Sequence, residues 1–437
     1  MFPNPHDALP LPPRPNLEQY KKLSKELLKA GKSSDPAALR AWCAAWIDSL
    51  VRLSSRSQES SVIPSEVALS QGDKATQSRD LLSSAADQLE RFARQKFSEA
   101  RSLTAAQFVI ARAHGFESWP KLAAHIESST RADSAVNHFE QAADAIVTGD
   151  AAVLERLLRQ SPGLVRARST RRHHAALLHY VGANGVEGYR QKTAVNVVEV
   201  ARLLLDAGAD VNSVADLYGG STTLALVATS VHPERAGVQE EMLGLLLARR
   251  AVIDRVKNDL AKNDRVKNDS AKNVSADSSP LLVNICLANG RSRAGEFLAR
   301  HGAVLDLEAA AGVGRLDLVA NYFDDAGSLK SAANKVQMER GFLWACEYGR
   351  NDVIEFLLPR GATLDAQADT GQTALHWAVI GGRLDTITLL LDRGAPREAT
   401  NSYGATPLGQ ALWSAAHGDS TIGYDKVAAL LRQRGAK

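Results

Sequence analysis

The chain has 437 residues, which is long for one compact core and predicts two or more units. Apolar residues make up 45% and charged residues 23%, as in soluble globular proteins, and no apolar stretch is long enough to predict a transmembrane helix. The net charge of +3 falls short of the basic excess of a typical nucleic-acid-binding protein. Three widely spaced cysteines argue against a disulfide framework or a structural zinc site, and favour a reducing, cytoplasmic compartment.

The N-terminal part of the chain predicts helices that follow no repeat. Residues 1–15 are rich in proline, are expected to be flexible, and lack the basic start and apolar run of a secretory signal. Residues 16–130 predict a helical region, with helices that begin after Asn16 and at Asp35. A Ser-rich linker is expected within this region at residues 54–78.

Residues 104–128 predict two helices joined by a glycine turn, a pattern that DNA-binding proteins also use. The second helix offers only Lys121 and His125 as ready contacts with nucleic acid, whereas a recognition helix presents several such side chains. We therefore expect these helices to cover the apolar end of the segment that follows them. Nucleic-acid binding stays a lesser alternative.

From residue 133 to the C-terminus the sequence repeats with a period of 33 residues. "TALHWA" begins at Thr373 and "TPLGQA" at Thr406, and "GRNDVIEFLL" and "GRLDTITLLL" begin equally far apart, at Gly349 and Gly382. In each copy a first helix begins at a capping residue and ends at glycine, and a second helix carries an apolar stripe. One helix pair cannot bury its apolar side alone, so the copies are expected to stack.

This period and its Thr-Pro-Leu-His-like openings resemble the ankyrin-repeat family. Two stretches match best, "LLLDAGADVN" at Leu203–Asn212 and "TALHWAVIGGRLDTITLLLDRGA" at Thr373–Ala395. The resemblance implies an all-α fold, an ankyrin-repeat α-solenoid of helix pairs joined by short hairpin-like loops, over residues 133–437. The segment 16–130 resembles the helical N-terminal region of bacterial ankyrin-repeat proteins, which implies a helical N-terminal cap and a bacterial cytoplasmic protein.

About eight repeats are expected, and several are irregular. Their starts lie near Phe139, Ala175, Ser221, Ser279, Leu307, Phe342, Thr373 and Thr406. The repeats near Ala175 and Ser221 hold additional residues between their two helices. Residues 255–277 contain RVKND twice, and this polar insertion is expected to be a solvated loop that arose by duplication, with a basic contact arm as the alternative.

Motifs for catalysis and cofactor binding are weak. "AGKSS" at Ala30–Ser34 lacks the upstream glycine of a phosphate loop, and "GVGRLD" at Gly312–Asp317 lacks the third glycine of a dinucleotide-binding turn. His173 and His174 are adjacent and would diverge on a helix, without a cysteine or carboxylate at metal-ligand spacing. We therefore expect no enzyme activity, no cofactor and no metal ion.

The irregular repeat near Ala175 and the residues that follow it gather polar and aromatic side chains. The candidates for a shallow pocket are His179, Tyr189, Arg190, Asp216 and His232. They lie in or beside loops that an ankyrin stack aligns along one side, where a cation could hold an anionic ligand. The alternative is a longer loop whose polar groups satisfy its own backbone. An enzymatic role would require Arg190 and His232 to converge on a cavity.

Alignment of the repeats by their glycines places Tyr180, Trp344 and Trp377 at one equivalent position. In the ankyrin family this part of the first helix looks toward the concave groove, and aromatic residues repeated there are typical anchors for a protein partner. The alternative is that these rings fill gaps between small neighbours. Loop tips offer a second surface. The candidates on the loop tips are Tyr218, Asp369, Gln372 and Tyr403.

The sequence therefore predicts a monomeric scaffold or adaptor that binds an unidentified protein through the concave face and loop tips of an ankyrin stack, without chemistry. A ligand-binding or enzymatic pocket built by the inserted repeat around residues 173–239 is the alternative. Contact with a membrane is not expected.

Overall fold

The computed structural model describes residues 7–12, 15–58, 71–253, 281–368, 370–418 and 422–437. The chain divides into two compact units, unit 1 within residues 1–272 and unit 2 within residues 273–437. The polar insertion expected at 255–277 lies outside the described residues. No helix in the described part of the chain combines the length and apolar character needed to cross a bilayer.

Unit 1 is mainly helical. Its α-helices are α1 (Leu17–Lys32), α2 (Ala38–Gln58), α3 (Gln71–Glu99), α4 (Leu103–Ala113), α5 (Trp119–Ser129), α6 (Ala135–Thr148), α7 (Ala151–Gln160), α8 (Val197–Asp206), α9 (Thr223–Thr229), α10 (Val231–Arg235) and α11 (Gln239–Ala248). Its short 3-10 helices are η2 (Pro162–Arg166), η3 (Leu177–Gly182) and η4 (Gly188–Arg190). Strands β1 (Val214–Ala215) and β2 (Ser221–Thr222) pair antiparallel, with Val214 opposite Thr222.

Helices α1 to α5 share one apolar core. In α1, Asn16 caps the first turn by accepting a hydrogen bond from the backbone N–H of Glu18 (2.8 Å), and Tyr20 and Leu27 lie on the buried side. The linker expected at 54–78 is helical at both ends, in α2 and α3, and its middle lies outside the described residues. Helix α5 packs against α6, so the N-terminal helices adjoin the first helix pair that follows them.

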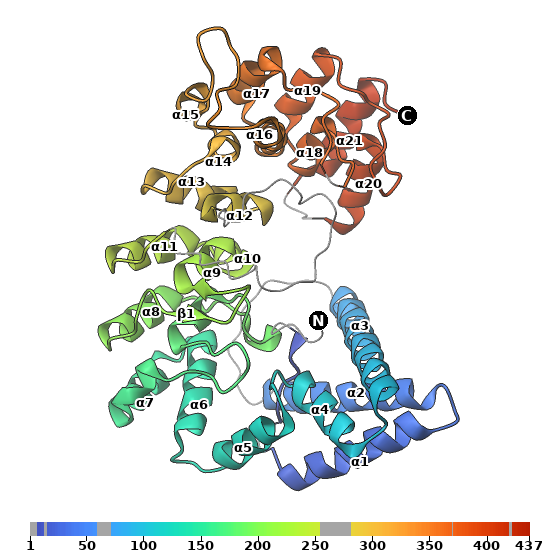
Figure 1. Cartoon of the computed structure of the whole chain (residues 1–437), viewed down its shortest axis with the longest axis vertical. Coiled ribbons are helices and arrows are strands. Elements are labelled where there is room, and N and C mark those ends of the chain that lie inside the picture. Colours follow the sequence, from blue (N-terminus) through green and yellow to red (C-terminus); the bar gives the residue numbers. More distant parts are fainter. Residues whose placement is uncertain (1–6, 13–14, 59–70, 254–280, 369, 419–421) are drawn as a thin grey trace. The chain divides into compact units, whose positions relative to one another are not determined.

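Three helix pairs complete unit 1, α6 with α7, η3 with α8, and α9 with α11 (Figure 1). The first helices α6, η3 and α9 contact one another in that order. In the middle pair the first helix is a short 3-10 helix, and it ends at Ala183, which adopts a left-handed backbone conformation (φ 46°). The segment from Ala183 to Asn196 then returns to the start of α8 and includes η4.

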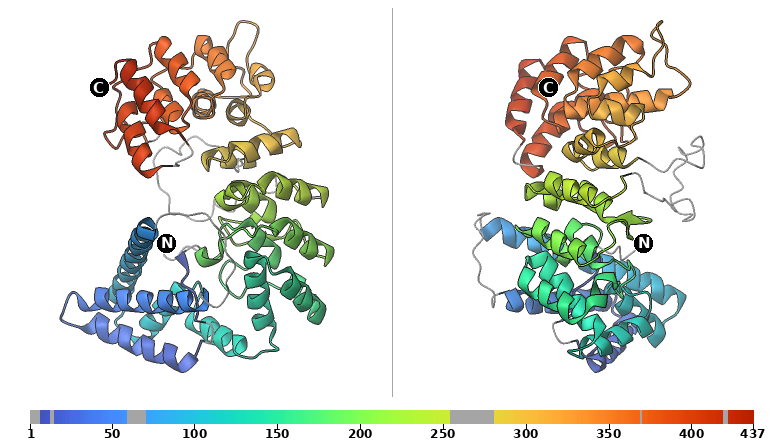
Figure 2. Two further views of the ribbon diagram at one scale, coloured as in Figure 1. Left: turned by 180° about the vertical axis from the view of Figure 1, so that it is seen from behind. Right: turned by 90° about the vertical axis from the view of Figure 1, so that its left-hand side faces the viewer.

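Unit 2 consists of five helix pairs in the described residues. Its helices are α12 (Leu282–Ala288), α13 (Ser292–Arg300), α14 (Leu307–Gly312), α15 (Leu316–Ala320), α16 (Lys335–Tyr348), α17 (Asn351–Leu357), η6 (Leu358–Arg360), α18 (Ala374–Ile380), α19 (Leu384–Asp392), α20 (Pro407–His417) and α21 (Tyr424–Gln433). The first helices α12, α14, α16, α18 and α20 contact one another in chain order. Figure 2 shows this stacking of layers within the unit from two other directions.

Small residues let the first helices of unit 2 approach closely. A Cβ atom added at Gly341 would lie 2.9 Å from the side chain of Ala311, and one at Gly381 would lie 1.9 Å from the carbonyl oxygen of Glu347. Beneath these contacts, Leu375 and Ala378 are fully buried. The apolar period of the sequence therefore forms a core that continues from one helix pair to the next, as a stack of repeats requires.

Candidate functional site

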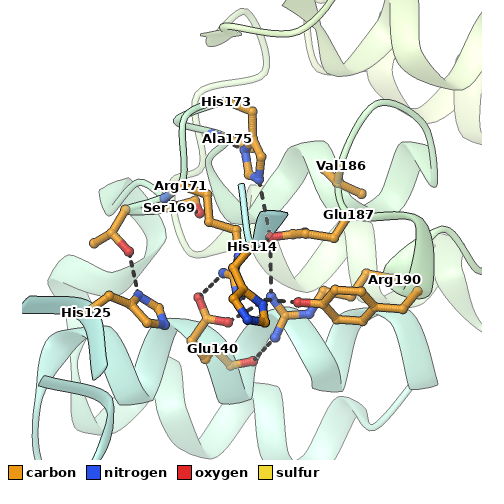
Figure 3. A network of polar contacts seen from close by, with 12 residues as sticks. His114, His125, Glu140, Ser169, Arg171, His173, Ala175, Val186, Glu187 and Arg190 are labelled. Carbon is orange, nitrogen blue, oxygen red and sulfur yellow. Dashed lines mark hydrogen bonds and ion pairs between the residues drawn. The ribbon is translucent and has the colours of Figure 1, made fainter. Parts of the chain in front are cut away.

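A cluster of buried charged side chains lies where the irregular repeat of unit 1 meets α6 (Figure 3). Helix α6 contributes Glu140, and the segment that contains η4 contributes Glu187 and Arg190. Arg171 and His173 come from the hairpin-like loop that a backbone bridge closes between residues 168 and 176. We call these five residues the charged network. Charged side chains are almost never buried in this way without partners.

Two guanidinium groups lie between two carboxylates in the charged network. Arg171 Nη1 lies 2.6 Å from Glu140 Oε1, and Arg171 Nε lies 2.9 Å from Glu187 Oε1. Arg190 Nη1 lies 2.9 Å from Glu140 Oε2, and Arg190 Nε donates a hydrogen bond of 2.8 Å to the exposed Asp144. His173 accepts from a backbone N–H through Nδ1 and donates through Nε2 to Glu187 (3.3 Å).

The charges in the network stabilise one another. Burial would raise the pKa of Glu140, but the charges of Arg171 and Arg190 overcome this effect and lower the pKa to about 2. Burial opposes ionisation of Glu187 as well, and Arg171 and His173 hold its pKa well below the usual range. The oxygen Oε2 of Glu187 is buried and has no hydrogen-bond partner among the described residues. The two arginines of the network therefore favour the ionised forms of its two glutamates inside the fold.

The structure brings together only two of the five residues predicted to form a pocket. Arg190 belongs to the charged network, and the hydroxyl of Tyr189 accepts a hydrogen bond from Arg171 (3.3 Å). His232 lies in α10, which packs against α11, and the bonds of Arg190 run to carboxylates instead. The contacts of Arg190 therefore give no support to the convergence with His232 that the enzymatic alternative required. Asp216 lies at the surface, where it pairs with His174 (2.7 Å).

His179 has a framework role that sequence reasoning missed. Its Nδ1 accepts from the backbone N–H of Ala176 (3.1 Å), and its Nε2 donates to the carbonyl of Ser213 (3.0 Å). His376 makes the equivalent bonds in unit 2, with Nε2 donating to the carbonyl of Ala405 (3.0 Å). Each histidine thus ties the start of a first helix to the loop of the next repeat. The prediction that His179 lines a pocket is wrong for this reason.

Tyr180 is fully buried, so the prediction that it binds a partner is also wrong. Its ring packs edge-on against Phe139, and the guanidinium of Arg190 lies 5.8 Å from the ring centre. The inserted segment thus covers the side of η3 that alignment by glycines had placed in the groove. An alignment that assumes a regular repeat could not show this cover.

Trp344 and Trp377 lie side by side on the neighbouring first helices α16 and α18 of unit 2. Both are partly exposed, and their ring centres are 5.9 Å apart at an interplanar angle of 57°. Tyr348 stacks on Trp344 one helical turn further along α16. Trp344 donates its indole N–H to Glu308 Oε1 (2.9 Å), whereas the indole N–H of Trp377 has no hydrogen-bond partner among the described residues.

The next first helix, α20, carries a third tryptophan that sequence reasoning missed. Trp413 is 59% exposed and stacks on His417. It lies three residues after Gln410, which aligns with Trp377, and residues three apart share one side of a helix. A search for exposed aromatic residues one turn away from the aligned position would have found it. We call the side of α16, α18 and α20 that carries the three tryptophans the tryptophan face.

Two acidic side chains accompany these aromatic rings, and sequence reasoning missed both. Burial raises the pKa of Glu308, and the hydrogen bond from Trp344 and the charge of Arg340 offset this only in part. Burial also raises the pKa of Glu347, to about 7, and its Oε2 has no hydrogen-bond partner in the described part of the chain. Neither carboxylate belongs to an ion pair among the described residues.

The loop-tip residues predicted from sequence differ in exposure. Tyr403 is 78% exposed and Tyr218 is 62% exposed, with the hydroxyl of Tyr218 donating to Asn184 (2.9 Å). Gln372 is partly buried and accepts from the hydroxyl of Thr370 (2.7 Å). Asp369 lies outside the described residues.

The two contacts considered for nucleic acid are both engaged within the protein. Lys121 pairs with Glu117 on the preceding turn. His125 is buried, and its Nδ1 bonds to the hydroxyl of Thr170 (2.7 Å). The second helix, α5, thus offers less to a DNA groove than its sequence indicated. No group of three or more His, Cys, Asp or Glu side chains in the described residues is arranged to hold a metal ion.

The stacked helix pairs define an α-solenoid repeat protein. The model of ankyrin repeats, in three copies, matches residues 342–437, so this part of the chain consists of ankyrin repeats. Among solved structures, the chain is similar to the ankyrin repeat domain of Bcl-3, a member of the IkappaB protein family. The identity is 18%, the match covers 67% of this chain and 97% of that chain, and the TM-score is 0.29. The comparison with curated proteins finds no match. Ankyrin repeats are generally protein–protein interaction modules.

Proposed function

We propose that the chain is a scaffold that binds a partner protein through the tryptophan face of unit 2. The observation that carries the proposal is the position of Trp344 and Trp377, adjacent on neighbouring first helices and partly exposed. Trp377 packs against the buried core of unit 2 through part of its ring, and both rings still leave apolar surface exposed. The exposed apolar surface of these rings can be buried by a partner protein. Tryptophan is among the residues most enriched at the centres of protein interfaces.

Binding on this face requires no chemistry. The first helices hold the rings in place before a partner arrives, so little conformational entropy is lost on binding. The exposed loop tip at Tyr403 extends the surface beside α20. We infer a non-enzymatic, monomeric module, and the three buried free cysteines suit a reducing compartment such as the cytoplasm.

Site-specific photo-crosslinking in the native cell tests this proposal. A photo-reactive residue replaces Gln410 on the tryptophan face, or Lys426 on the second helix α21 as a positional control. We expect a discrete crosslinked protein from position 410 and none from position 426. The double variant Trp344→Ala/Trp377→Ala should lose that product by at least about 10-fold, since each such anchor contributes roughly 2 kcal/mol or more.

A matched control separates binding from stability. Trp42 in unit 1 is also partly buried, so Trp42→Ala removes the same side chain from elsewhere. Trp413→Ala provides a further test, because its exposed ring contributes little to folding. The proposal is wrong if the folded double variant and Trp413→Ala both keep the product at the level of Trp42→Ala.

A further inference from the structure

The tryptophan face combines aromatic rings with two carboxylates that form no ion pair in the described part of the chain, although Arg340 and Arg383 lie near enough to act on them. Glu308 bonds to Trp344 through Oε1 and is only partly buried, so its second oxygen stays available. Glu347 lies on α16 between Trp344 and Tyr348 in the helical register, since residues three and four apart share one side of a helix. Both carboxylates have a raised pKa, which means that their charged forms would gain from a nearby cation.

The second helices of the same unit are different. There, Glu355 pairs with Arg393 (2.9 Å) and Asp392 pairs with Arg434 (2.5 Å), and both carboxylates are well exposed. Glu355 and Asp392 on the second helices thus have basic partners within the chain. On the tryptophan face, the positive side chain that acts on Glu308 is Arg340, one turn before Trp344 on α16, and it lies beyond ion-pair distance.

We propose that the tryptophan face seats a basic side chain, lysine or arginine, of the partner protein, with the rings of Trp344 and Trp377 against the cation and Glu308 as its counter-ion. This inference rests on the proposed function and names the chemistry of the partner at that surface. Tryptophan is the aromatic side chain that attracts cations most strongly, and a neighbouring carboxylate adds a charge-assisted contact. Glu347 is too deeply buried for direct contact and contributes through its charge.

The neutral alternative is an apolar side chain on the same rings. It would leave Glu308 next to apolar surface, and its ionised form would lose hydration on binding without gaining a partner. Charge complementarity therefore favours the basic side chain. Arg340 competes with that side chain for Glu308, so removal of Arg340 should strengthen binding.

The test follows the indole N–H signals of the full-length protein by NMR. The chain holds six tryptophans, so labelling of tryptophan alone gives six indole signals, and Trp344→Phe and Trp377→Phe assign two of them. The probes are N-acetyl-lysine methylamide, N-acetyl-arginine methylamide and the uncharged N-acetyl-norleucine methylamide. We expect the signals of Trp344 and Trp377 to shift with the two basic probes and not with norleucine.

Charge-only variants test the role of the carboxylate. Glu308→Gln keeps a hydrogen-bond acceptor for Trp344. It should lower the affinity for the lysine probe by about 5-fold, which corresponds to the free energy of one partly exposed charge contact. Glu355→Gln, which removes the same charge from a second helix, should leave affinity unchanged, and Arg340→Gln should increase it. Three results would each overturn the proposal that the tryptophan face binds a basic side chain: equal shifts with the norleucine probe, unchanged affinity in Glu308→Gln, or no shifts with any probe. Crosslinking from position 410 would then still report on protein binding separately.

Discussion

Replacement of Arg171 by methionine should strongly destabilise unit 1. Arg171 is fully buried and pairs with both Glu140 and Glu187. Methionine has a similar reach but no charge, so in the variant Arg171→Met the fully buried Glu187 and the partly buried Glu140 share the single guanidinium of Arg190. Removal of one partner from a buried ion pair costs about 3–5 kcal/mol. Because a domain is stable by only about 5–15 kcal/mol, this loss would be a large fraction of the stability of unit 1.

The position of the tryptophans allows the two units to be followed separately during unfolding. Fluorotryptophan labelling gives resolved fluorine signals, three from each unit. Those of unit 1 are Trp42, Trp46 and Trp119, and those of unit 2 are Trp344, Trp377 and Trp413. In urea, Arg171→Met should lower the midpoint of the unit 1 transition by about 1–2 M, with the unit 2 transition unchanged.

A second substitution distinguishes lost charge balance from lost packing. Arg171→Met/Glu187→Gln leaves the pair of Glu140 with Arg190 intact, so it should regain at least about half of the lost stability. The pKa of Glu187 should rise in Arg171→Met, because that pKa depends on the charge of Arg171. A carboxyl group with a raised folded pKa costs stability as the pH rises, so the deficit should shrink toward low pH. A deficit below about 1 kcal/mol, or a double variant less stable than Arg171→Met, would refute the reasoning.

Three further predictions concern other sites. The pKa of Glu347 is raised from 4.5 to about 7, so wild-type unit 2 loses stability as the pH rises through this range. In urea titrations, Glu347→Gln should therefore be more stable than the wild type by up to about 3 kcal/mol at pH 8, and as stable as the wild type at pH 4. Gly381→Ala should destabilise unit 2 by at least about 2 kcal/mol, because the added Cβ would meet the backbone of α16. Gly409 has room for a Cβ, so the control Gly409→Ala should change the stability by less than about 1 kcal/mol. Equal effects of the two variants in calorimetry would contradict the contact at Gly381. Burial lowers the pKa of three unit 1 histidines from 6.5 to about 4, so the unfolded state binds more protons and unit 1 should lose up to about 3 kcal/mol per histidine as the pH falls from 6.5 to 4. Fluorine signals of unit 1 that stay native down to pH 4 would count against this last prediction, which concerns His114, His125 and His179.

The stacking of helix pairs could be predicted from sequence because it depends on local and regularly spaced residues. The glycines, the apolar stripe and the opening at Thr373 recur every 33 residues, and each has the same physical task in every copy. The partly exposed positions of Trp344 and Trp377 follow from the same register. Prediction failed where the register breaks, since the additional residues after η3 turn a groove position into the buried site of Tyr180.

The charged network could not be predicted for a different reason. Its members come from α6, from a loop and from the inserted segment, and Glu140 lies 50 residues before Arg190. Buried and exposed arginines look alike in a sequence, and only the fold shows that Arg171 is enclosed. Likewise, Glu347 stands in a helix whose pattern assigns it no special environment, and its exceptional pKa arises from neighbouring helices packed through glycine.

The charged side chains of the unit 1 network form ion pairs, whereas two carboxylates of unit 2 form none among the described residues. In unit 1 the buried charges are paired, so each depends on its partners and the network favours one conformation of the inserted segment. In unit 2 the carboxylates of Glu308 and Glu347 form no ion pair in the described residues and hold a raised pKa, which lowers the stability of the free protein at neutral pH. A bound cation would remove part of that cost, so folding stability given up by the free unit is regained as binding free energy. Glu347→Gln should therefore both raise the stability of unit 2 and lower its affinity for the lysine probe. A glutamate with a purely structural role would not produce this pair of effects.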